Sequence, residues 1–154
     1  MLETPHVALG IAIATKIPNP WIAIPLAFTS HFLLERIPHW NPHLNTETEI
    51  FGRPTKKSTV IVIIDVTISL ILGFFIAYKS LPNSAQSVNI LLCSFASVLP
   101  DILEGPYFFL GIRNKFLEKW ISLQKSIQVD TNFILGMTTQ LITLVAILFW
   151  IFKS

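Results

Sequence analysis

The sequence predicts an all-α fold, a polytopic membrane helix bundle of four to five segments. Of its 154 residues, 52% are hydrophobic and only 13% are charged, whereas soluble domains carry about 25% charged residues. The mean hydropathy is +0.62. Several apolar runs approach the roughly 20 residues that a membrane crossing needs. We therefore interpret residues 1–154 as a single integral membrane domain.

The first two apolar segments are short. Residues 5–15 are too few to cross a membrane alone. Thr4 followed by Pro5 predicts a helix start, with a hydroxyl N-cap and a proline at the first helical position. A proline-rich break separates this segment from residues 21–37, which end at Pro38. The two segments form either a re-entrant helical hairpin or a thin pair of spans.

The rest of the chain alternates polar and apolar stretches. In order, we expect a polar loop at 38–57, a span at 58–78, a turn at 80–87, a broken apolar segment at 88–112, a surface segment at 113–130 and a span at 131–152. Asp65 interrupts the first of these spans, and Pro100 breaks the segment at 88–112.

Counting lysine and arginine predicts the orientation of the chain. If the first two segments form a hairpin, eight such residues share the side of the N-terminus and three lie opposite. The positive-inside rule then predicts a cytoplasmic N-terminus. The larger group comprises Arg36, Arg53, Lys56, Lys57, Arg113, Lys115, Lys119 and Lys125, and the smaller comprises Lys16, Lys79 and Lys153.

That topology gathers the ionisable residues of the apolar segments near one membrane face. They are His6, His31, His39, Asp65 and Asp101. Each costs roughly 2.5–3.5 kcal/mol at membrane depth on insertion scales. Histidine nitrogens and carboxylate oxygens are the usual ligands of zinc and manganese, so this set predicts a site for one divalent metal ion or two.

Two glutamates accompany the predicted ligands. Glu35 follows His31 at i+4 and Glu104 follows Asp101 at i+3, so each pair shares a helix face. Either glutamate can act as a general base or orient a histidine. Two simpler roles stay open: Asp101 after Pro100 can cap a new helix, and Asp65 can hydrogen-bond a neighbouring helix.

A weak internal repeat supports the grouping. Ile37-Pro38-His39 ends one segment, and Leu99-Pro100-Asp101 echoes it later. A helical-hairpin unit occurring twice would supply histidines from its first copy and aspartates from its second.

The sequence argues against three further features. The net charge is only +2, without a basic arm or interleaved aromatic and basic residues, so no nucleic-acid partner is expected. The lone Cys93 excludes an intramolecular disulfide. The N-terminus lacks a basic region followed by a small-residue cleavage site, so no signal peptide is predicted.

Three short motifs resemble a family of small prokaryotic integral membrane proteins described as membrane-bound metal-dependent hydrolases, some of them phospholipase-like. The motifs are Thr4-Pro5-His6, Ser30-His31 through Pro38-His39-Trp40, and Leu99-Pro100-Asp101. This sequence departs from the family pattern at Glu35, where aspartate is expected, and around Gln124, where related proteins carry histidine. The resemblance implies a prokaryotic inner (plasma) membrane location.

These observations predict a membrane-embedded metal-dependent hydrolase that acts on a phosphoester or lipid-like substrate at the cytoplasmic interface. Its partners would be membrane lipid and a divalent ion such as zinc or manganese. The alternative is a non-enzymatic membrane scaffold or a small transporter-like protein coupled to protons or ions.

Overall fold

The computed structural model describes residues 1–153, which contain eight helices and no β-strand. The all-α prediction is therefore confirmed over that range. The helices are α1 (Glu3–Lys16), α2 (Pro20–Leu34), α3 (Leu44–Phe51), α4 (Lys56–Lys79), α5 (Ser84–Ile102), α6 (Gly105–Phe109), α7 (Lys115–Ile127) and α8 (Phe133–Phe152). Three of them, α4, α5 and α8, are long and apolar enough to cross a membrane.

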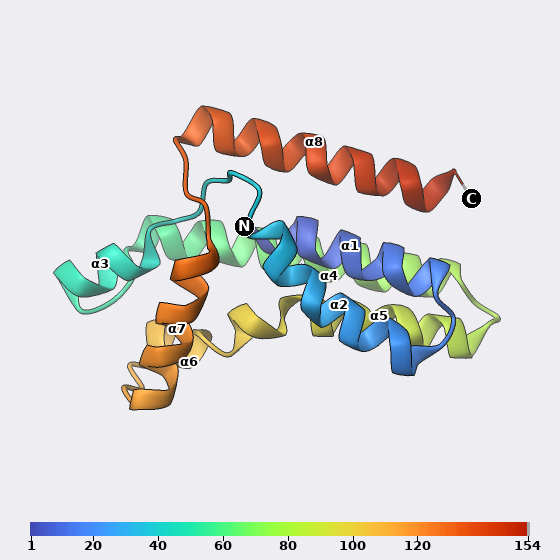
Figure 1. Cartoon of the computed structure of the whole chain (residues 1–154), viewed down its shortest axis with the longest axis horizontal. Coiled ribbons are helices and arrows are strands. Elements are labelled where there is room, and N and C mark those ends of the chain that lie inside the picture. Colours follow the sequence, from blue (N-terminus) through green and yellow to red (C-terminus); the bar gives the residue numbers. More distant parts are fainter. Residues whose placement is uncertain (154) are drawn as a thin grey trace.

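Helix α1 lies at the centre of the bundle and packs against α2, α4, α5 and α8 (Figure 1). Its sequence suits this position because small and β-branched residues alternate around it. Ala8, Ile11, Ala12 and Ala14 are all fully buried. Helices α1 and α2 form a short antiparallel pair of 14 and 15 residues.

The two ends of the bundle differ. Helices α1, α4 and α8 all finish at the same end, and the short helices α3, α6 and α7 gather at the other (Figure 1). Helix α7 runs across the bundle direction there. The lysines in the last turns of α1 and α4 are Lys16 and Lys79, so the smaller basic group lies away from the short helices.

The predicted start of the first helix was wrong. Helix α1 begins at Glu3, and its N-cap position, Leu2, offers no side-chain acceptor. The Asp65 carboxylate from α4 supplies it, accepting hydrogen bonds from the backbone N–H groups of Glu3 at 2.5 Å and Thr4 at 3.3 Å. A tertiary cap thus replaces the local one expected at Thr4.

Two further boundaries differ from the sequence-based expectation. Helix α5 continues through Pro100 to Ile102, although the proline removes one backbone hydrogen bond from the helix. The expected polar loop at 38–57 contains α3, which ends at Gly52 in the left-handed region with φ of 74°.

Helices α1 and α5 approach each other closely at Gly10. A Cβ atom built there would lie 2.6 Å from the Cys93 carbonyl oxygen and 2.9 Å from Ser97 Oγ. At Gly73 on α4 the nearest atom would be 3.6 Å away, an ordinary contact. The α1–α5 interface therefore needs glycine, and the α4 position does not.

We expect Gly10→Ala to destabilise the protein by about 1–3 kcal/mol, because the α5 backbone must move to admit the methyl group. Gly73→Ala is the matched control and should be neutral or stabilising by up to about 1 kcal/mol through helix propensity. Thermal unfolding in detergent compares the two. Equal melting temperatures for both variants would contradict the assigned packing.

Candidate metal centre

The ends of three helices bring His6, His31 and Asp101 together. His6 lies in the first turns of α1, His31 in the last turn of α2 and Asp101 in the last turn of α5. One ligand atom from each lies within 4.8 Å of the others. Both imidazoles are fully buried and stack with ring centroids 4.2 Å apart.

The hydrogen bonds of His31 fix which nitrogen carries its proton. Nδ1 lies 2.9 Å from the Ser97 carbonyl oxygen, which only accepts, so Nδ1–H is the donor. Nε2 then faces Gln124 Oε1 at 3.1 Å and Asp101 Oδ1 at 3.5 Å. Two oxygens thus surround a nitrogen lone pair, and either a second proton or a bound cation removes the conflict.

Turning the Gln124 amide does not relieve this conflict. As placed, Gln124 Nε2 donates to Asp101 Oδ1 at 3.1 Å. Exchanging its nitrogen and oxygen would satisfy His31 but set an amide oxygen against the Asp101 carboxylate. The cluster therefore has more acceptors than donors in either orientation of the Gln124 amide.

His6 has a complementary arrangement. Its Nε2 lies 3.1 Å from Glu35 Oε1, and a carboxylate only accepts, so Nε2–H is the donor. Its Nδ1 is buried and has no hydrogen-bond partner. An unpartnered buried nitrogen is costly unless something binds it.

Glu35 joins two histidines. Besides His6, it lies near His39, whose Nε2 is 3.4 Å from Glu35 Oε2. His39 Nδ1–H donates to the Ile37 carbonyl at 2.7 Å. The α-amino group of Met1 also donates to Glu35 Oε1. Glu35 is therefore placed to orient the His6 imidazole.

The residues present fit a divalent cation. Metal-binding histidines usually donate their other N–H to a carboxylate or a backbone carbonyl, as His6 and His31 do here. Donors at about 2.0–2.2 Å on one tetrahedral zinc ion are about 3.3–3.6 Å apart. The observed limit of 4.8 Å is larger, so side-chain rotations would have to bring the three ligand atoms closer together.

The sequence analysis missed Gln124, which approaches the cluster from α7. Two backbone hydrogen bonds join the chain after α7 to the chain around His39. His39 N–H donates to Val129 O at 3.1 Å, and Thr131 N–H donates to His39 O at 3.0 Å. A glutamine on an amphipathic helix carries no local sign of this role. The indication in the sequence was the family pattern, which has a histidine near this position.

Two of the five predicted ligands lie outside the group of three. His39 contacts Glu35. Asp65 caps α1 and also accepts a hydrogen bond of 2.6 Å from Thr4 Oγ1, as the interhelical alternative proposed. The helix-capping alternative for Asp101 was wrong, since Asp101 lies inside α5 and the N-cap of α6 is Glu104.

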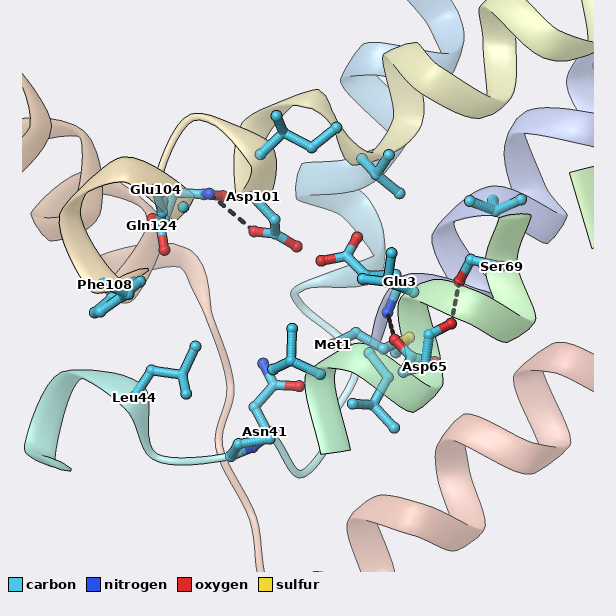
Figure 2. A pocket seen from close by; sticks show the side chains of 18 of the residues that line it. Met1, Glu3, Asn41, Leu44, Asp65, Ser69, Asp101, Glu104, Phe108 and Gln124 are labelled. Atoms are coloured by element: carbon cyan, nitrogen blue, oxygen red, sulfur yellow. Dashed lines mark hydrogen bonds between the residues drawn. The ribbon is translucent and has the colours of Figure 1, made fainter. Parts of the chain in front are cut away.

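A cavity of about 530 Å³ opens beside the cluster (Figure 2). Glu3, Asp65, Asp101 and Glu104 line it. Glu3 Oε2 and Glu104 Oε1 are buried there without hydrogen-bond partners. Burial and the neighbouring Asp101 carboxylate raise the pKa of Glu104 to about 8. This wall of the cavity therefore has more acceptors than donors.

The fold and the cluster together define an all-α protein with three helices suited to span a membrane and a buried histidine–carboxylate centre at one end. Comparisons with protein-family models, with curated proteins and with solved structures found no match for this chain.

In metal-free protein, we expect the stability of Glu104→Gln relative to the parent to increase as pH rises. The pKa of Glu104 is about 8 in the folded protein and ordinarily 4.5. The parent therefore loses stability between about pH 4.5 and 8, whereas a glutamine cannot ionise. Melting temperatures at pH 5 and pH 9 with a chelator test this, and a pH-independent difference would contradict it.

We expect Asp65→Ala to lower stability by about 1–2 kcal/mol through loss of the α1 cap and to leave the metal content of purified protein unchanged. Thr67→Ala is the control, because Thr67 is exposed on the same helix and bonds only its own Ile63 carbonyl. Loss of metal without loss of stability would instead make Asp65 a ligand.

Proposed function

We propose that this protein is an integral protein of a prokaryotic inner membrane and a metal-dependent hydrolase. Its substrate would be a phosphoester or lipid-like molecule that reaches the cluster from the cytoplasmic interface. The observation that carries the proposal is the pairing of His6 and His31, each with one ring nitrogen donating to a fixed acceptor and the other left without a donor.

His6, His31 and Asp101 are the residues that would hold the ion. A divalent ion such as zinc or manganese supplies Lewis-acid chemistry and lowers the pKa of water. Glu35 holds the His6 ring in place by accepting its Nε2 proton. This contact supports an orienting role for Glu35 and favours it over that of a general base.

Glu104 is the better candidate for moving a proton. It lines the cavity, and its Oε1 has no hydrogen-bond partner. With a pKa of about 8, its carboxyl group holds a proton at neutral pH. It can therefore donate that proton to a leaving alkoxide, the role of a general acid.

The position of α7 supports a cytoplasmic, interfacial site. This helix lies across the bundle end (Figure 1), as a helix on a membrane surface would. It carries Trp120, half-buried against the Pro100 carbonyl, together with exposed Lys115 and Lys119. Aromatic residues mark the interface, and lysines mark the cytoplasmic side.

The packing disfavours the transporter-like alternative. Beyond the cavity, the bundle interior is filled by Ile11, Ile90 and Cys93, all fully buried. The polar groups therefore cluster at one end.

The pairs α1–α2 and α4–α5 each supply one predicted ligand from the first helix and one from the second, which supports the proposed hairpin repeat.

The metal content of purified protein tests the proposal. We expect a stoichiometric divalent ion in the parent and its loss in His31→Ala, with parallel loss of phosphodiester hydrolysis. His43→Ala is the matched control for metal content, because His43 is exposed in the loop before α3. Glu35→Gln should weaken metal affinity about 10–100-fold, the usual effect of removing a partner of a metal-binding histidine.

Two results would refute the proposal. One is a parent protein that binds no divalent ion after dialysis against zinc or manganese. The other is retention of bound metal by His31→Ala at the level of the parent.

A further inference from the structure

The cavity beside the cluster continues as an apolar groove between the two long helices α4 and α5. Val66, Leu70 and Phe74 line it from α4, and Leu91, Phe95 and Val98 line it from α5. The residues on α4 recur at i+4 and those on α5 at i+3 or i+4, so the apolar side chains of each helix lie along one of its faces. The cavity is therefore polar at one end and apolar along its length.

Small residues between the two helices make room for this groove. Ser69 and Gly73 on α4 and Ser94 on α5 are buried and line it, and Val7 of α1 forms its floor. Leu70 and Phe95 are about half exposed, at 54% each, so the side of the groove is open. Since α4 and α5 are candidate membrane spans, this opening would face lipid.

The groove has the dimensions of one lipid leaflet. It extends along α4 from Val62 to Phe74, twelve residues or about 18 Å at 1.5 Å per residue. The hydrocarbon core of a bilayer is about 30 Å thick, so one leaflet contributes about 15 Å. An acyl chain entering sideways from the membrane would fit between the two helices.

The polar end favours a positively charged head group. Glu3, Asp101 and Glu104 line it, and two of these carboxylates have a buried oxygen without a partner. Among the described residues that line the whole cavity, Lys125 is the one lysine or arginine. An ammonium group would supply N–H donors to these unpartnered oxygens, whereas an anionic phosphate offers only further acceptors.

We propose that the cavity binds a zwitterionic aminophospholipid, with one acyl chain between α4 and α5 and its ammonium group near Glu3 and Glu104. The phosphate would lie toward His6, His31 and Asp101. This inference names the substrate class of the proposed hydrolase, and it rests on that function for the reaction but not for binding.

Two variants that fill the groove test the binding site. Gly73→Leu adds a side chain where Gly73→Ala makes only ordinary contacts, so the alanine variant is the matched control. Leu70→Trp narrows the groove from its exposed rim and leaves the buried core untouched. Binding is measured with a photoactivatable phosphatidylethanolamine in vesicles of phosphatidylcholine, followed by mapping of the labelled peptides.

We expect labelling on α4 and α5 in the parent and in Gly73→Ala. Gly73→Leu and Leu70→Trp should reduce it at least about tenfold, the change produced by 1.4 kcal/mol of lost binding energy. Competition by phosphatidylethanolamine should exceed that by phosphatidylglycerol, and Glu3→Gln should remove this preference. Labelling that is unchanged in both Gly73→Leu and Leu70→Trp, or equal competition by the two lipids, would overturn the proposal.

Metal content measured on the same samples separates this inference from the proposed function. Gly73→Leu should keep its metal while losing lipid, because the groove lies away from the histidines. Lipid labelling in a chain that binds no metal would refute the hydrolase and leave the lipid site standing. Metal binding without groove labelling would refute the lipid site alone.

Discussion

The N-terminal end of α1 is buried, and its free backbone N–H groups need acceptors inside the protein. Two long helices supply them: Asp65 of α4 accepts from Glu3 and Thr4, and Gln140 of α8 accepts from the Leu2 N–H at 2.8 Å. These bonds fix the height of α1 in the bundle and therefore the position of His6. A helix this short would otherwise be free to slide along its apolar neighbours.

The cluster tolerates so many buried polar groups because helix ends bring their own acceptors and donors. His31 uses a carbonyl in the last turns of α5, and Glu35 lies just past the end of α2. A polar group buried with a partner costs far less than one without. Among the groups that lack donors or partners are His31 Nε2, His6 Nδ1 and Glu104 Oε1, which belong to residues of the cluster or of the adjoining cavity.

Much of this arrangement was predictable from sequence, because costly residues in apolar segments are few. His6, His31 and Asp101 were grouped, together with His39 and Asp65, from the topology that charge counting predicts, and the fold class followed from composition. The role of Asp65 was not predictable, since a cap for α1 contributed by α4 depends on tertiary packing. Gln124 was missed because glutamine on an amphipathic helix ordinarily faces water. The predicted break at Pro100 was wrong because a helix can continue through a proline at the loss of one backbone hydrogen bond.

Gln124 also couples two parts of the molecule that differ in environment. It lies on α7, at the membrane surface in the proposed topology, and its amide meets His31 and Asp101 inside the bundle. Any ligand that changes these two residues must alter the free energy of docking α7. By thermodynamic reciprocity, forces that lift or press α7 alter affinity at the cluster equally. In the proposed topology, the lateral pressure and surface charge of the bilayer would therefore act on the interior of the protein through α7.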